Sequence, residues 1–444
     1  MLRQFVITLV ALLTAAAAAA QDSRRLTLDD AIARAVERNP AIRAAGAAAD
    51  EAGARVQQAK AGYLPRVDFA EAWQRGNQPV YVFGSLLAQR RFTSADFALD
   101  ALNHPDAISN HRVGVVIQQP IFDGWQTRAA VTGARLDTSA ALLDREIAAA
   151  RLRVDVVTAF GRAISARAAR ESASAAVATA QEDLGRAEAR RDAGLETEAT
   201  VLAFRVHLAD AEANQARAEA NAMVARAALN GLIVEPLDDT TPLAGLTDLP
   251  ARDGDIAALE TEALAARAEL RQADLRRRQA EASRMRARAG LLPQVFVQGT
   301  AEANGHTFAD RASAWSAGVE VRWNIFAGGA DAARMSEADA AARRAGAERE
   351  RLETAVRLEV RSTLADHRVA RAREAASRRM VEQARESQRI IRDRYDAGLA
   401  PASDVVRAAE LLARADTART AAEVDVHVTA AAFDRAVGRS GLKP

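Results

Sequence analysis

Cysteine is missing from this sequence of 444 residues. Its absence excludes disulfide bridges, thiolate metal sites and attachment of a lipid to an N-terminal cysteine. An excess of positive charge is missing too, because 60 basic and 59 acidic side chains leave a formal net charge of +1. Proteins that bind nucleic acid carry a basic patch or stripe. We therefore expect no nucleic-acid partner.

Long apolar runs are confined to the start of the chain. Residues 1–20 combine Arg3, a short apolar core and a run of alanines, a pattern that predicts a cleavable signal peptide for secretion. A membrane anchor is the weaker alternative, because the strongly apolar part is too short to cross a hydrocarbon layer of about 30 Å. No later segment has twenty continuous apolar residues, so we expect no transmembrane helix in the mature protein.

Catalytic motifs are also missing. The sequence has no phosphate-binding loop, no nucleophile elbow and no close pair of histidines on a helix face. Its six histidines are scattered, and simple surface histidines are a better interpretation than weak metal ligands. We expect no enzymatic activity, no cofactor and no bound metal.

What the chain does contain is a pair of very long stretches without proline, residues 124–191 and 328–395. Each has 68 residues, so a continuous helix there would be about 100 Å long. In the first stretch, apolar residues recur every seven positions, as at Leu136, Leu143 and Val157. This spacing predicts a helix packed in coiled-coil fashion, against close neighbours because many seam residues are alanine.

The two stretches belong to a tandem duplication. Shifting the sequence by 204 residues superposes them, and a shift of 228 superposes the segment 61–65 on 289–293. We therefore predict a first structural repeat at 21–234, a linker at 235–254 outside the helical wall, and a second repeat at 255–444. The first repeat carries 24 extra residues between these two anchors.

Shorter helices complete each repeat. Four segments of about 35 residues have helical patterns, and two of them placed end to end match one long helix. Each repeat then supplies one long and two short helices, packed antiparallel as the wall of a tube. The four segments are 28–62 with a break at Asn39-Pro40, 196–231, 252–289 and 401–437.

Four other segments alternate apolar and polar residues, which predicts strands with one apolar face. Fourteen of the nineteen aromatic residues lie in 63–125 or 293–326, around these strands, and 76–110 is expected to be a loop. The predicted apolar, lipid-facing residues are Val67, Phe69, Trp73, Val115, Ile117, Val295, Val297, Trp315, Val319, Val321 and Trp323.

Such alternation with tryptophans near the strand ends is typical of a membrane β-barrel, and four runs in an exported chain favour it over a soluble sheet. A membrane tolerates no open sheet edge, so four strands must be closed by oligomerisation. Eight strands from a dimer would leave little lumen, whereas a trimer gives a barrel of twelve strands with a pore. The predicted fold is mainly α, with long antiparallel helical hairpins forming an α-barrel tunnel and four strands per protomer in this trimeric barrel.

The duplicated landmarks resemble the TolC-type outer membrane efflux proteins over essentially the whole mature chain. The resemblance is carried by the strand entries at 61–65 and 289–293, the strand exits at 121–124 and 325–328, and the motif at 395–406. It implies a homotrimer in the lipid of the outer membrane with a large periplasmic portion. It also implies a periplasmic adaptor protein and an inner-membrane RND or ABC pump as partners.

We accordingly expect a passive export duct for small molecules such as drugs or metals. A duct for type I protein secretion is a close variant, and a periplasmic coiled-coil scaffold is a more distant alternative. The resemblance places Asp404 at the periplasmic entrance, with Arg407 where a second acid is frequent in the family. The reversing turns are predicted to be helix caps and adaptor-docking sites, formed by Gly194, Leu195, Tyr395, Gly398 and Leu399.

Overall fold

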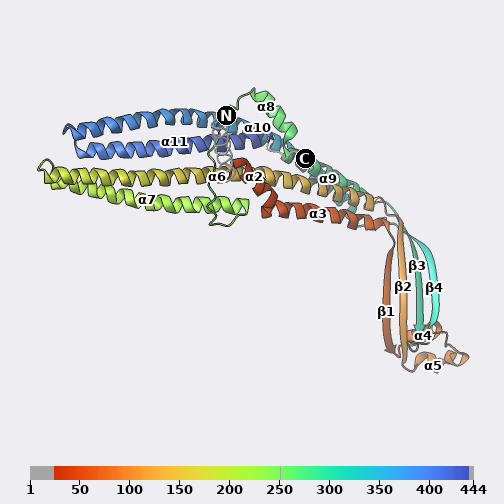
Figure 1. Cartoon of the computed structure of the whole chain (residues 1–444). Helices are drawn as coiled ribbons and strands as arrows, with labels where there is room; N and C mark the ends of the chain where they lie inside the picture. Colours follow the sequence, from red (N-terminus) through yellow and green to blue (C-terminus); the bar gives the residue numbers. More distant parts are fainter. Residues whose placement is uncertain (1–24, 251, 440–444) are drawn as a thin grey trace, which may run out of the picture. The chain divides into compact units, whose positions relative to one another are not determined.

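The computed structural model describes residues 25–250 and 252–439. They form two compact units (Figure 1). The first unit consists of the described residues up to Ala47, Leu142–Arg271 and those from Glu350 onward. The second consists of Ala48–Ala141 and Gln272–Arg349. The predicted signal peptide, 1–20, lies outside the described residues.

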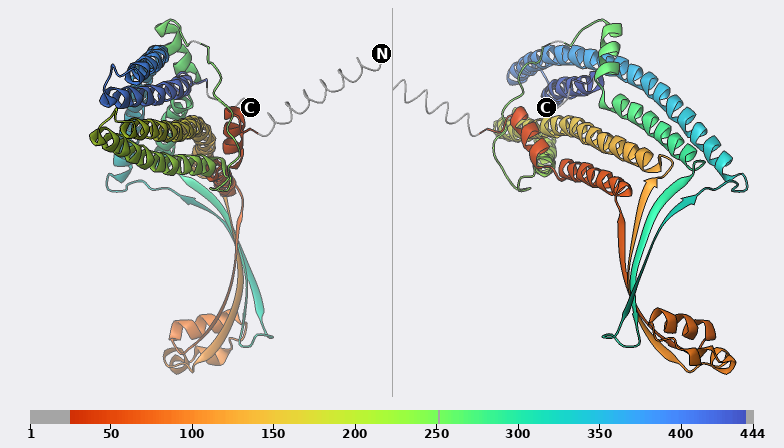
Figure 2. Two further views of the ribbon diagram at one scale, coloured as in Figure 1. Left: turned by 60° about the vertical axis from the view of Figure 1, so that its left-hand side comes forward. Right: turned by 90° about the vertical axis from the view of Figure 1, so that its right-hand side faces the viewer.

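Two helical hairpins lie side by side in the first unit (Figures 1 and 2). One joins most of α6 to α7, and the other joins most of α10 to α11. The two long helices have 67 residues each and the two shorter ones 36. The bounds are α2 Leu28–Arg38, α6 Gln126–Asp192, α7 Glu198–Ile233, α8 Ile256–Ala266, α10 Ala330–Asp396 and α11 Ala402–Val437.

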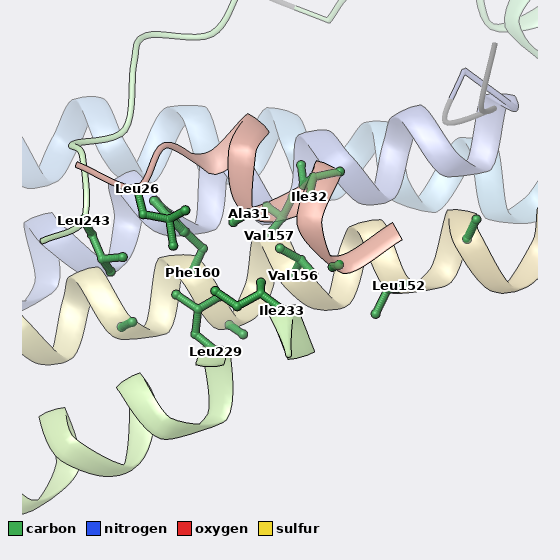
Figure 3. Close-up of a cluster of buried hydrophobic side chains, with 14 of the residues drawn as sticks. Leu26, Ala31, Ile32, Leu152, Val156, Val157, Phe160, Leu229, Ile233 and Leu243 are labelled. Carbon is green, nitrogen blue, oxygen red and sulfur yellow. The ribbon is translucent and has the colours of Figure 1, made fainter. Parts of the chain in front are cut away.

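The main core of the first unit surrounds Phe160, whose side chain is fully buried (Figure 3). It packs within a cluster that α2, α6 and α7 build together, with Leu229 and Ile233 from the last turns of α7. A second cluster joins α8, α10 and α11 around Val360 and Phe433. These clusters hold larger side chains than the alanine-rich hairpins and therefore supply more apolar burial per residue.

The segment between the repeats, 235–254, is fastened to the first unit by backbone and side-chain hydrogen bonds. The amide of Leu26 donates to Pro242 O at 2.8 Å, and the amide of Ala244 donates to Leu26 O at 2.9 Å. The buried Asn230 amide donates to three carbonyl groups of the segment, including that of Asp239 at 2.9 Å. Leu243 joins the main core, so the segment is an integral part of the unit.

The second unit contains an antiparallel sheet with the strand order β1-β2-β3-β4. Parts of α3, α6, α9 and α10 complete it, together with the short helix η1. A β-bulge between Pro120 and Phe122 takes Ile121 out of the alternation expected at the end of the second strand. The bounds are α3 Pro40–Lys60, η1 Ala61–Tyr63, β1 Arg66–Gly76, β2 Ile108–Phe122, α9 Ala268–Ala289, β3 Gln294–Gly305 and β4 Ala312–Arg322.

The break between α8 and α9 corrects the prediction of one continuous helix over 252–289. The helices separate at Arg267, whose backbone leaves the helical region with ψ 127. Its guanidinium is buried and pairs with Glu269 at 2.8 Å and with Glu359. This position lies 228 residues after Asn39, where α2 and α3 separate with ψ 130. The duplication therefore includes the break, although Arg267 is followed by alanine and lacks the proline signal.

The segment 76–110 also differs from the predicted loop, because it contains helices. Pro79 occupies the first turn of α4, where its missing N–H has no cost. Three phenylalanines then stack edge to face, with Phe92 at 5.0 Å from both Phe83 and Phe97 between ring centroids. The apolar content of the segment thus supports local helices: α4 Pro79–Ala88, η2 Ser94–Phe97 and α5 Leu99–Asn103.

The main core of the first unit yields a stability prediction. Phe160→Ala should lower the free energy of unfolding by about 3–5 kcal/mol, because it removes a fully buried aromatic side chain and leaves a cavity. Arg151→Ala removes a long, exposed side chain from the same helix and should cost less than about 1 kcal/mol. Denaturant unfolding of the purified protein, followed by circular dichroism, measures both. Equal losses would show that the Phe160 cluster does not dominate the stability of this unit.

Candidate functional site at the helical turns and on the sheet

The two turns that reverse the long helices share one backbone geometry. Gly194 has φ +73 and Gly398 has φ +75, a region that glycine enters without strain. The amide of Leu195 donates to Arg190 O at 2.8 Å, and the amide of Leu399 donates to Arg394 O at 2.7 Å. The Gly194 amide also donates to Arg191 O, and the Gly398 amide to Tyr395 O, both at 2.9 Å. Each turn is therefore a Schellman motif. The predicted cap is present, and both leucines are exposed.

Tyr395 differs from the other predicted turn residues because it is buried, with an exposed fraction of 5%. Its ring centroid lies 6.1 Å from that of Phe204, and the Arg190 guanidinium lies 5.2 Å from its ring centroid. Ala187, Val201, Phe204 and Val405 complete the cluster, so all four hairpin helices contribute. Tyr395 therefore ties the two hairpins of one chain together and offers no docking surface in this structure.

The hydroxyl group of Tyr395 remains neutral in its site. Burial, together with the nearby Glu196 carboxylate, raises the pKa of Tyr395 to about 12. Ionisation would place a negative charge in an apolar cluster beside another acid, which is unfavourable. The residue consequently contributes packing and aromatic contacts at physiological pH.

Buried ion pairs add a second connection between the hairpins, which the sequence analysis missed. The Asp183 carboxylate of α6 is only 7% exposed and lies 3.0 Å from the Arg186 guanidinium and 3.4 Å from that of Arg392 on α10. Arg190 also donates to Asp396 O at 3.2 Å. The heptad positions counted from Leu136 and Leu143 do not include Asp183, so the predicted spacing offers no signal for this buried acid.

The two predicted entrance residues lie on one side of the first turns of α11. Asp404 Oδ1 is 3.6 Å from Arg407 Nη1, and the arginine side chain is largely exposed. An exposed pair of this kind contributes little stability, although it offsets the local negative charge. The position equivalent to Asp404 in the first repeat is Thr200, whose amide donates to Thr197 Oγ1 at 3.3 Å. An acid is thus present in only one of the two repeats.

The sheet register brings the predicted lipid-facing residues together. Directly opposed residues in antiparallel strands share a face. One row joins Val67, Ile117, Gly299 and Ala317 across all four strands. The rows on either side place the other predicted strand residues on the same face, namely Phe69, Trp73, Val115, Val295, Val297, Trp315, Val319 and Val321. Trp323 is the exception, because it follows the end of β4, and its indole donates to Leu291 O at 3.1 Å.

The apolar face also contains charged residues that the sequence analysis did not include. Glu71 is opposed to Val113, which puts it on the face of Phe69 and Trp73. Its carboxylate lies 3.8 Å from the Arg311 guanidinium, which stacks 3.8 Å from the ring centroid of Phe308. On the other side of the Glu71 row, the rows from Phe69 to Val295 and Val321 are apolar except for Gln119, which opposes Val297.

The opposite face of the sheet is polar. Arg66, Gln118 and Gln298 form one row across β1, β2 and β3. In the next row the hydroxyls of Thr300 and Ser316 are 2.7 Å apart. The sheet thus separates an apolar side from a polar side, as strands do at a boundary between lipid and water.

His367 and His427 of the helical unit are buried, which corrects the interpretation of all six histidines as surface residues. His367 Nδ1 lies 3.1 Å from Thr429 Oγ1, and burial, followed by the nearby Arg252 and Arg371 charges, lowers the pKa of His367. Burial likewise lowers the pKa of His427. Within residues 25–250 and 252–439, no group of three or more histidine, aspartate or glutamate side chains could hold a metal ion. None of the described helices is long and apolar enough to span a membrane.

Comparison with solved structures finds the same fold in bacterial outer membrane proteins. The outer membrane protein VceC from Vibrio cholerae matches with a TM-score of 0.74 at 21% identity, covering 93% of this chain and 96% of that chain. The CmeC outer membrane channel from Campylobacter jejuni matches with a TM-score of 0.79 at 16% identity, covering 93% and 86%. The MtrE outer membrane channel from Neisseria gonorrhoeae, solved in an open state, matches with a TM-score of 0.73 at 19% identity, covering 93% and 88%.

These structures confirm the predicted fold of long helical hairpins with four strands per chain. A search of curated protein sequences finds no match. The family model described as outer membrane efflux protein matches residues 31–233 and 259–439, which include all four hairpin helices and all four strands. This chain therefore belongs to the outer membrane efflux protein family, as the duplicated sequence landmarks predicted.

Proposed function

We propose that this protein is a passive duct of the outer membrane, formed by three copies of the chain. The observation that carries the proposal is the two-faced sheet with two open edges. Within the described chain, β1 and β4 each have a strand on one side only. In lipid, unpaired backbone groups cost several kcal/mol each, so the edges must pair with other copies. Three copies then give a closed barrel of twelve strands, with lipid outside and a polar lumen inside.

The helical hairpins supply the second part of the duct. We infer that they form a periplasmic tunnel, since a helix of 67 residues is about 100 Å long. The tunnel connects the barrel with a periplasmic adaptor protein and an inner-membrane RND or ABC pump, which provides the energy. The cargo is small toxic molecules such as drugs or metal ions. Family membership supports efflux over type I protein secretion, and the apolar sheet face argues against a soluble periplasmic scaffold.

Adjacent residues of β2 allow a matched test of the barrel. Ile117 lies in the middle apolar row and Val116 on the polar face, with exposed fractions of 45% and 41% in the isolated chain. Ile117→Arg should reduce trimer assembly, because arginine at the lipid midplane costs about 2–4 kcal/mol per copy. Val116→Arg should be tolerated in the lumen. Heat-modifiable migration of outer-membrane fractions measures the trimer, and equal yields from the two variants would contradict the barrel.

The entrance proposal concerns Asp404. Three copies converging at a narrow mouth would attract cations, although Arg407 weakens the field of each carboxylate. Asp404→Ala should weaken block of single-channel current by multivalent cations added at the tunnel side, and Arg407→Ala should strengthen it. Unchanged block in both variants would leave Asp404 only a helix-stabilising role in the first turn of α11.

The docking proposal concerns the two turns, of which three copies would present six. Gly398→Val places a β-branched residue at φ +75, which costs about 1–3 kcal/mol of local strain. Leu399→Ser alters the exposed side chain without that strain. Both variants should form trimers but lose chemical cross-linking to the adaptor and export less. Normal cross-linking and export by both would show that docking occurs elsewhere on the tunnel.

A further inference from the structure

Helix α4 is attached to the sheet at the end where β1 finishes and β2 begins (Figures 1 and 2). Its Tyr81 hydroxyl donates to Gln74 O of β1 at 2.7 Å. The Gln89 amide, just after the helix, donates to Ser109 O at 2.9 Å and to Asn110 Oδ1 at 3.0 Å, both on β2. These hydrogen bonds fix both ends of α4 against the strands.

The attachment is on the polar face of the sheet. Gln74 opposes Asn110, and Arg112 opposes Asn304, so both asparagines belong to the rows of the polar face. The Asn110 amide donates to Asn304 Oδ1 at 2.9 Å and thereby extends the network from β2 to β3. Asn110, the strand side chain that Gln89 contacts, therefore points to the same side as the proposed lumen.

Arg90, which follows α4, contacts β4 at the other edge of the sheet. Its guanidinium donates to Ser313 O of β4 at 2.9 Å. The backbone of Arg90 has φ 55, a left-handed conformation that residues other than glycine rarely adopt. The surrounding contacts maintain this conformation. Together with the Tyr81 bond to β1, the contact makes α4 a crossbar over the polar face from β1 to β4.

The two sides of α4 have opposite environments. Val82, Ser85 and Gln89 are buried, and Gln89 is hydrogen-bonded to β2. At 100° per residue, Val80, Gly84 and Leu87 lie on the opposite side of the helix. Val80 is 86% exposed and Leu87 50% exposed, and no described atom lies within 4 Å of an ideal Cβ at Gly84. The apolar stripe formed by Val80, Gly84 and Leu87 thus faces away from the polar strands.

From these observations we infer that α4 forms an apolar constriction at the outer mouth of the duct, lined by three copies of this stripe. The inference rests on the proposed trimeric barrel. Twelve tilted strands spaced about 4.8 Å apart enclose a cylinder roughly 25 Å across between backbones. A helix with its side chains is about 10 Å wide, so three crossbars on the inner wall nearly fill that opening.

The apolar character of such a constriction affects which solutes pass through it. Water leaves a narrow apolar ring readily, which impedes ions even without a complete steric block. The strand rows behind the ring are polar, so the apolar stripe is confined to this one level. Of the proposed cargoes, the constriction consequently favours drugs that carry apolar surface over metal ions, and it retards small hydrophilic solutes that enter from outside.

The absence of native cysteine allows a direct test with single thiols. The stripe variants are Gly84→Cys and Leu87→Cys, and the matched control is Leu99→Cys on exposed α5 of the same loop. Trimers in planar bilayers receive a cationic methanethiosulfonate reagent on the side of the loops. Single-channel conductance should fall at least about two-fold in the stripe variants and change little in the control. A bismaleimide about 10 Å long should cross-link subunits through the stripe positions only.

The outcomes separate this inference from the proposed function. Mass spectrometry confirms that each introduced thiol has reacted. Modified stripe variants that keep their full conductance, or that fail to cross-link between subunits, overturn the constriction while the duct itself stands. If the unmodified protein forms neither a trimer nor a conducting channel, the proposed duct has failed, and the constriction fails with it.

Discussion

The pairing of backbone groups at the edges of the sheet is the constraint on which the rest of this structure depends. β1 and β4 are its edge strands, and each offers a full row of N–H and C=O groups to a neighbour. In water these backbone groups could remain solvated. The apolar rows around Ile117 are suited to lipid, however, and lipid cannot form hydrogen bonds with unpaired backbone groups. A chain with this sheet must associate through its strand edges. In the proposed trimer the same association would bring the helices together as well, so one requirement would set both the barrel and the tunnel.

The helical hairpins solve a different packing problem. Their seams contain small residues such as Ala180 and Ala187, which allow close approach but bury little apolar area. Specific pairing between the hairpins therefore relies on a few larger or charged groups at defined heights. Tyr395 packs against Phe204 near the turns, and Asp183 pairs with Arg392 across the hairpins. A buried acid with arginine partners disfavours other registers, because a shift by one turn would leave its charge unpaired.

Periodicity and duplication made most of the fold predictable, whereas contacts distant in sequence limited the prediction of the site. The long helices and the apolar face follow from local spacing, and the cap at Gly398 follows from its residue type. Burial of Tyr395 depends on Phe204 from the other hairpin, which no local pattern reveals. The break at Arg267 has no local signal either, because its ion partner Glu359 is distant in the sequence. The repeat offset of 228 from Asn39 would have located it. The crossbar α4 lies in an insertion without a counterpart, so the repeat could not predict it.

Comparison of the two repeats also separates positions that set the backbone conformation of the turns from positions whose side chains differ between the repeats. Equivalent backbone geometry at Gly194 and Gly398 shows that the turn itself needs the same residue in both repeats. The neighbouring side chains need not match: Tyr395 corresponds to Arg191, which is paired with Glu198 at 3.2 Å instead of being buried in the apolar cluster. Asp404 likewise corresponds to a threonine. In the proposed trimer, two similar halves with unlike turns would give a ring of alternating surfaces, and the proposed adaptor would meet two kinds of site, three of each.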